Sequence, residues 1–201
     1  KQEIRKRKYA VLVEGYFDFA QVLQAGITPA VATCGTALTS YQSRLLRRYT
    51  SKVVLNFDAD TAGQAAAARS GELLIADGFQ VNIAVLPDRE DPDTFIREQG
   101  AERYMEILRN SRQYLEFMLD RAAADYDFTS DNQRRKFLNQ MLTVAKSIPD
   151  AATRDQFADR LAHKARVMEE VVRLEIRKAA VARRTSVEEQ AVPYQPAVRT
   201  A

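Results

Sequence analysis

The most constraining feature of the sequence is an apolar run over residues 53–57 that ends in the triplet Asp58-Ala59-Asp60. Such a run is typical of a buried strand in a parallel α/β sheet, and ligands bind at the carboxyl ends of such strands. Because side chains alternate along a strand, Asp58 and Asp60 are expected to point the same way. Two close carboxylates repel each other unless a cation lies between them, and Mg²⁺ prefers oxygen ligands. The triplet therefore predicts a magnesium site, with helix capping as the alternative role of these aspartates.

A third carboxylate, Glu14, follows an earlier apolar run over residues 9–13. Gly15 allows a tight turn into a helix that is expected to carry Phe17 on its apolar face and to end at Gly26. Asp18 falls in the first turn of this helix. It either joins the metal site or complements the helix dipole.

The next segment predicts a short strand over residues 30–32 and a loop that contains Gly35 and Thr36. Small and hydroxyl residues around a glycine can present backbone N–H groups to a phosphate. A capping-box pattern over residues 39–42 then begins a helix. A cluster of cations on this helix is a candidate contact for a triphosphate or a template backbone. The cluster consists of Arg44, Arg47 and Arg48.

A last predicted strand over residues 81–86 leads into an acidic loop. Asp91 is expected to cap the helix that Pro92 begins, and Asp93 is expected to point toward the region of Asp58. Four strands that alternate with helices predict an α/β fold, a parallel sheet with helices on both faces. From residue 101 onward the pattern predicts helices and no strand.

The pattern divides the chain into three parts. A catalytic α/β domain is expected over residues 1–100, an all-α helical subdomain over 101–184, and a flexible tail or linker over 185–201, which has two prolines and no periodicity. The tyrosines of the helices, among them Tyr16 and Tyr41, are interpreted as packing residues.

The composition limits the class of protein and the cellular compartment that fit this chain. The 201 residues carry a net charge of +3, so the whole chain is not a strongly basic nucleic-acid binder. One cysteine and one histidine exclude an internal disulfide and a zinc cluster. The sequence has no apolar run of transmembrane length, no signal peptide and no initiator methionine, which indicates a cytoplasmic fragment of a longer protein.

Four motifs occur in order with helical spacers: Glu-Gly-Tyr-Phe-Asp over 14–18, Gly-Thr-Ala-Leu-Thr over 35–39, Asp-Ala-Asp over 58–60 and Asp-Pro-Asp over 91–93. The first and third resemble the Glu and Asp-x-Asp motifs of the TOPRIM superfamily. The set is similar to the catalytic core of bacterial replicative primases of the DnaG type, over roughly residues 5 to 180. The resemblance implies a TOPRIM-type sheet and a bacterial cytoplasmic enzyme.

The resemblance implies DNA-directed synthesis of RNA primers on single-stranded DNA by metal-dependent nucleotidyl transfer. Glu14, Asp58 and Asp60 match the catalytic carboxylates. These three and Asp93 are the implied ligands of Mg²⁺ or Mn²⁺, and Asp18 and Asp91 lie around them. Glu14 remains either a metal ligand or an acid or base. The implied partners are a single-stranded DNA template, ribonucleoside triphosphates, the RNA primer and a single-stranded DNA-binding protein, with no membrane.

The resemblance implies that the family's full-length protein has further domains that this chain lacks. Zinc is expected only on an absent amino-terminal domain. The replicative helicase is expected to bind through a carboxyl-terminal domain that is missing from this chain or begins in the tail after Thr185.

Three other functions would use parts of the same pattern. A TOPRIM nuclease, or another metal-dependent phosphoryl-transfer enzyme on nucleic acid, could use the same carboxylates. A topoisomerase would also need a nucleophilic tyrosine, and the tyrosines are better explained by packing. A receiver module would need a lysine after its fifth strand, but no lysine lies between Lys52 and Lys136.

Overall fold

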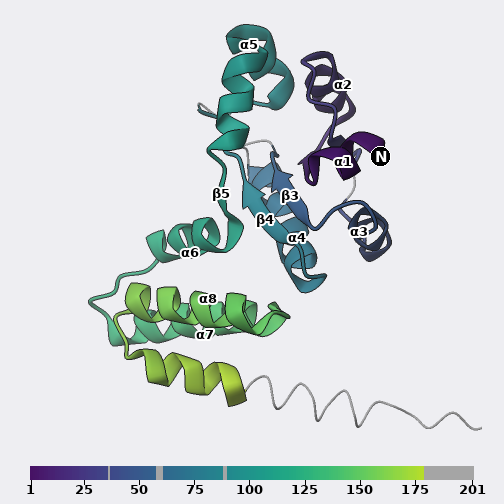
Figure 1. Cartoon of the computed structure of the whole chain (residues 1–201). Helices are drawn as coiled ribbons and strands as arrows, with labels where there is room; N and C mark the ends of the chain where they lie inside the picture. Colours follow the sequence, from purple (N-terminus) through teal and green to yellow (C-terminus); the bar gives the residue numbers. More distant parts are fainter. Residues whose placement is uncertain (36, 58–60, 88–89, 179–201) are drawn as a thin grey trace, which may run out of the picture.

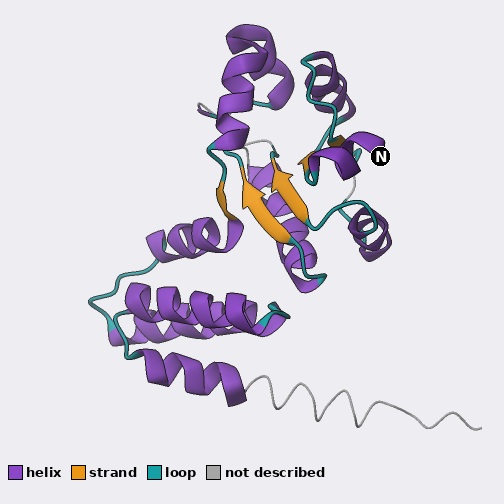
Figure 2. Ribbon diagram, viewed as in Figure 1, coloured by secondary structure: helices purple, strands orange, loops and turns teal. Residues whose placement is uncertain are grey.

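The computed structural model describes residues 1–35, 37–57, 61–87 and 90–178, so Thr36, Asp58 and Asp60 lie outside the described residues. Its centre is a five-stranded sheet in the order β2-β1-β3-β4-β5. Figure 2 shows strands at the centre of this part of the molecule with helices around them. The strands are β1 (Ala10–Val13), β2 (Ala30–Ala32), β3 (Lys52–Leu55), β4 (Gln80–Ile83) and β5 (Arg112–Gln113).

The first four strands run parallel, as the alternation of strands and helices predicts. Leu12 of β1 is in register with Leu55 of β3, and Leu55 is in register with Ile83 of β4. The expectation of no strand after residue 101 is wrong, because β5 pairs with β4 in the antiparallel direction. β5 has only two exposed polar residues and forms by pairing with an exposed edge, so no apolar pattern announces it.

The helices agree with most of the predicted caps. They are α1 (Gln2–Arg7), α2 (Tyr16–Gln24), α3 (Ser40–Arg47), α4 (Thr61–Ala76), α5 (Pro92–Arg109), α6 (Tyr114–Ala124), α7 (Asp131–Ser147) and α8 (Ala151–Ala165), followed by helical residues 169–178. Thr39 caps α3 and Asp91 caps α5, both through hydrogen bonds to backbone N–H groups. Helix α1 was not expected, because the first eight residues read only as a run of charge.

The two faces of the sheet have separate cores. Val11 and Val13 of β1 pack with α2 and α5 on one face. Leu12 of β1 and Leu55 of β3 pack with α4 and, through a continuous apolar cluster, with α6, α7 and α8 on the other face. Figure 1 shows α6, α7 and α8 grouped beside the sheet. Among the described residues, no helix combines the length and the apolar character that crossing a membrane requires.

The junction between the sheet and the helical part depends on one close contact. The Tyr114 hydroxyl donates a hydrogen bond to the Ala68 carbonyl of α4 at 3.0 Å. A Cβ atom at Gly71 would lie 2.3 Å from the Tyr114 ring, so only glycine lets α6 cross α4 this closely. On the far side, Asp120 of α6 pairs with Lys164 of α8 at 2.6 Å. The predicted boundary at residue 100 falls inside α5, at the non-helical Gly100, and α5 packs on the sheet on both sides of it.

Three aromatic side chains depart from the predicted packing. Phe17 is 82% exposed, and Tyr16 and Tyr41 are 70% and 71% exposed. Each lies in the first turn of its helix, and these turns follow directly on the loops at the sheet edge. Val22 carries the buried face of α2 instead.

Candidate functional site

The site is built at the carboxyl ends of the parallel strands. Glu14 follows β1 directly, and its backbone carbonyl accepts hydrogen bonds from the Cys34 N–H at 2.9 Å and the Thr33 hydroxyl at 3.3 Å. These bonds join the turn after β1 to the loop after β2. The half-buried Glu14 is therefore fixed at the sheet edge where the sequence predicts it.

Among the described carboxylates of this region Asp18 is the most buried, with 7% of its surface exposed. One of its oxygens accepts the Gly15 N–H at 3.0 Å, which closes the first turn of α2. Its other oxygen accepts the Asp93 N–H at 3.3 Å, across 75 residues of sequence. Asp18 thus joins the beginnings of α2 and α5. It lies in the first turn of α2, where a carboxylate complements the helix dipole, and its part in a metal site stays a prediction.

Asp91 and Asp93 complete the described acidic group. Asp91 caps α5 by accepting the Thr94 N–H at 2.6 Å, as predicted. Asp93 forms an ion pair with Arg97 one turn later, and its side chain is 21% exposed. The helix begun by Pro92 therefore presents both carboxylates beside Asp18.

The electrostatics of this group favour a cation. Burial raises the pKa of Asp18, and the charges of Asp91 and Asp93 raise it further, while the N–H groups of Gly15 and Asp93 lower it. A divalent ion would offset this repulsion, and the donors are all oxygens, which suits Mg²⁺. No three His, Cys, Asp or Glu side chains within the described part of the chain are grouped closely enough to hold a metal ion. A metal site would therefore need Asp58 or Asp60, which lie outside the described residues.

Two buried residues hold the end of β3, the strand that precedes Asp58 in the sequence. The sequence pattern did not identify either of them as part of the site. Asn56 donates from its side-chain amide to the Ala84 carbonyl at 3.0 Å, and its backbone N–H donates to the Leu12 carbonyl at 2.9 Å. The hydroxyl of Tyr104, which is fully buried, donates to the Asn56 side-chain oxygen at 2.5 Å. Burial raises the pKa of Tyr104, and the nearby charge of Asp18 raises it further. The signal in the sequence was a single asparagine inside an apolar run.

The loop after β2 lies at the same edge. Cys34 and Gly35 both have positive φ, at 60° and 75°, so the chain turns sharply there. The exposed Tyr16 lies beside this turn, and a hydrogen bond with the Cys34 thiol raises the pKa of Tyr16. Gly35 is thus near the predicted site, whereas Thr36 lies outside the described residues.

The arginine cluster does not join the carboxylates. Helix α3 begins after the loop that follows β2 and runs back along the sheet, so Arg44, Arg47 and Arg48 lie at or near its far end. The Arg47 guanidinium lies 5.1 Å from the centre of the Phe79 ring, just before the first residue of β4. The arginines are therefore at the amino ends of the strands, opposite the predicted metal site.

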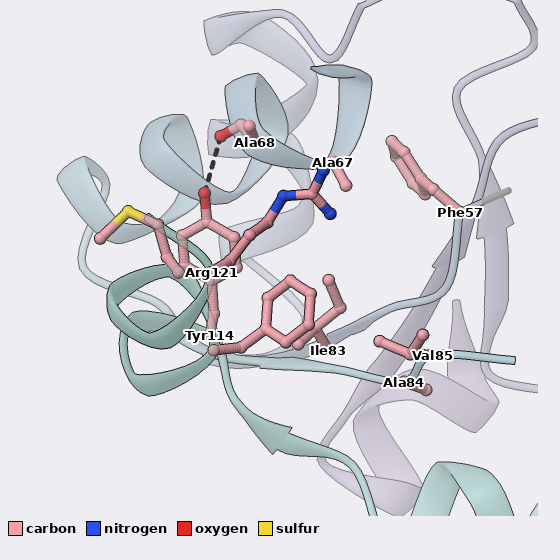
Figure 3. A pocket seen from close by; sticks show the side chains of 10 residues that line it. Phe57, Ala67, Ala68, Ile83, Ala84, Val85, Tyr114 and Arg121 are labelled. Carbon is pink, nitrogen blue, oxygen red and sulfur yellow. Dashed lines mark hydrogen bonds between the residues drawn. The ribbon is translucent and has the colours of Figure 1, made fainter. Parts of the chain in front are cut away.

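An apolar cavity of about 100 Å³ adjoins the ends of β3 and β4 (Figure 3). Phe57, Val85 and Tyr114 line it, and Arg121 reaches across it from α6 toward α4. None of the described lining residues is a carboxylate. The cavity is therefore not part of the described acidic group.

Two family models match the chain. A model described as Toprim-like matches residues 11–96, and a model described as the DnaB-helicase binding domain of primase matches residues 115–170. The second match lies inside the chain. It contradicts the expectation that a helicase-binding segment is missing from this chain or begins only in its tail.

Curated relatives and solved structures agree with these models. The chain is 35% identical over 162 residues to the DNA primase of Clostridium acetobutylicum, and 36% identical over 160 residues to that of Haemophilus influenzae. These matches cover 81% and 78% of the chain but 27% of each relative, so the chain spans about a quarter of the curated relatives.

Three solved structures share the fold. A DNA primase domain from Pseudomonas aeruginosa matches with a TM-score of 0.78 and 26% identity, over 88% of this chain and 56% of that one. The primase catalytic core of E. coli matches with a TM-score of 0.73 and 30% identity, over 80% and 52% of the two chains. A DnaG primase catalytic domain bound to single-stranded DNA matches with a TM-score of 0.74 and 29% identity, over 81% and 53%.

Proposed function

Because the chain belongs to the family of bacterial DnaG-type DNA primases, we propose that it carries the carboxylate site of such an enzyme and that this site adds ribonucleotides to an RNA primer on a single-stranded DNA template. The observation that carries the proposal is the hydrogen bond from the Asp93 N–H to Asp18. It draws two acidic segments to the strand ends beside Glu14.

Asp58 and Asp60, with Asp93, are the proposed holders of the divalent ion, which is Mg²⁺ or Mn²⁺. When bound, the ion neutralises charge on the phosphate under attack and on the leaving pyrophosphate. Glu14 has one of two roles: it binds the same ion or it accepts the proton of the attacking 3′-hydroxyl.

The surrounding residues position these carboxylates. Asp18 holds the backbone of Asp93, and the Tyr104–Asn56 hydrogen bond holds the end of β3 two residues before Asp58. The first contact is partly buried and the second is buried, so both resist movement of the site when substrates with several negative charges bind.

The direct test is Asp58→Asn in the primase that contains this chain. Asparagine keeps the size of the side chain and removes its charge. Template-dependent primer synthesis should fall by about 100-fold or more, with an unchanged circular dichroism spectrum. The control is Asp125→Asn, which changes an exposed aspartate after α6 and should leave synthesis intact. Retained synthesis in Asp58→Asn would contradict the proposal.

The match over residues 115–170 supports a second part of the proposal: this segment contacts the replicative helicase. Met168 is an exposed apolar side chain in it, with 67% of its surface accessible. Met168→Asp should weaken helicase binding in a calorimetric titration, because a charge would then replace an apolar contact. Tyr41→Asp, at a similarly exposed position near the sheet, should not. Equal binding by the parent and Met168→Asp would remove Met168 from the contact.

A further inference from the structure

A groove with a cationic rim lies on one face of the sheet at the amino ends of β3 and β4. Its volume is about 520 Å³, and Arg7, Lys52 and Arg109 line it. Tyr9 and Val54 contribute to its uncharged floor and are only partly buried. No Asp or Glu occurs among the described residues that line the groove. The groove therefore carries positive charge, and the last turns of α5 form one of its walls.

The three cations come from different elements that meet at this point. Arg7 is the last residue of α1, Lys52 is the first of β3 and Arg109 is the last of α5. The Thr50 hydroxyl fixes two of these elements, because it donates to the Lys8 carbonyl at 2.9 Å and accepts the Lys52 N–H at 3.1 Å. The backbone that carries the cations is thus held in place while the side chains remain exposed.

The charge of the groove is only weakly offset. Arg7 pairs with Glu3 at 3.5 Å, but both side chains are substantially exposed, at 49% and 39%. Such pairs contribute little in water. The cations Lys8 and Arg47 continue the positive charge along the same edge of the sheet.

We propose that this groove binds the sugar–phosphate backbone of single-stranded nucleic acid. Cations on separate walls suit successive phosphates of one strand, and the partly buried Tyr9 ring offers a surface on which a base can stack. The choice of nucleic acid as the ligand rests on the proposed function. The groove itself is separate from the carboxylate site, because four-residue strands of about 3.3 Å per residue place it roughly 13 Å away.

The test measures binding of a labelled oligothymidylate to the full 201-residue chain by fluorescence anisotropy at several salt concentrations, with a chelator present. The groove variant is Arg7→Gln/Lys52→Gln/Arg109→Gln. The matched control is Arg135→Gln/Lys136→Gln/Arg177→Gln, which removes three exposed cations from the helical part. All six side chains are exposed, so both variants are expected to keep the parent's circular dichroism spectrum.

We expect the groove variant to lower the magnitude of the slope of log affinity against log salt by about 2. Each of the three lost phosphate contacts to a single strand should reduce that slope by about 0.7. The control should keep the parent slope. Equal losses in both variants, an unchanged groove variant or a parent that does not bind would each overturn the proposal. Because metal is excluded, failure of the carboxylate site cannot affect this result, and failure of the groove leaves the metal site untouched.

Discussion

The two edges of one sheet differ in charge. The carboxyl ends of the strands lead into Glu14, Asp18, Asp91 and Asp93, whereas the amino ends carry Lys52 and its cationic neighbours. All four parallel strands point the same way, so residues that follow strands gather at one edge and residues that precede strands gather at the other. Strand polarity thus separates the proposed cation site from the proposed phosphate-binding groove within one small domain.

The largest expected difference between the edges is in catalysis. Asp93→Asn removes a carboxylate from the carboxyl edge and should reduce primer synthesis by about 100-fold or more. Metal-free binding of oligothymidylate should not weaken, because Asp93 carries negative charge and lies away from the groove. Anisotropy and primer extension on the same variant check this. Weakened binding with normal synthesis would reverse the assignment of the two edges.

A smaller effect is expected from the hydrogen bond that fixes β3. Tyr104→Phe removes the donor to Asn56 and leaves a buried amide oxygen without it. The free energy of unfolding should fall by about 1–3 kcal/mol, measured by urea denaturation. The control is Tyr126→Phe, whose hydroxyl bonds to Gln140 at an exposed position and should cost less. Equal losses would mean that the Asn56 network does not have a special role.

Substitutions of Asp91 can distinguish its role as a helix cap from a role in metal binding. Asp91→Ala should lower the free energy of unfolding by about 1 kcal/mol, because α5 loses its cap, whereas Asp91→Ser keeps a capping oxygen and should lose little. Thermal denaturation of both variants measures this. If Asp91 also serves the metal site, Asp91→Ser should reduce primer synthesis despite its normal stability. Full synthesis in Asp91→Ser would leave capping as its role.

The smallest effect concerns Arg47. Arg47→Met replaces the guanidinium over the Phe79 ring with an uncharged side chain of similar length. The free energy of unfolding should fall by about 0.5–1 kcal/mol, because the cation–π contact is lost. Because the Arg47 guanidinium contacts that ring, we expect it to contribute less than Lys52 to phosphate binding. Arg47→Met should therefore change the slope of log affinity against log salt for oligothymidylate less than Lys52→Gln does. A larger change for Arg47→Met would extend the proposed groove along the edge.

Local patterns were sufficient for most of the fold. The parallel strands follow from apolar runs, and the caps at Thr39 and Asp91 follow from side chains that accept nearby N–H groups. The family resemblance pointed to bacterial primases of the DnaG type, and the comparisons with known primases confirm that family. The two-residue β5 escaped because a pairing partner, not a pattern, creates it.

The site was only partly predictable because some of its contacts are distant in sequence. The Tyr104–Asn56 bond spans 48 residues, and the bond from Asp93 to Asp18 spans 75. The arginines of α3 were predicted to contact a triphosphate or a template backbone. The structure places Arg47 beside Phe79, before β4, and the contact itself remains a prediction. The roles of Glu14, Asp58 and Asp60 remain predictions.

The central claim is that the carboxyl edge holds a divalent ion, and calorimetric titration of Mn²⁺ into the 201-residue chain tests it most directly. We expect the parent and the Asp125→Asn control to bind Mn²⁺. Asp58→Asn and Asp60→Asn should lose that binding while their circular dichroism spectra stay unchanged. Equal binding by all four proteins, or no binding by the parent, would contradict it.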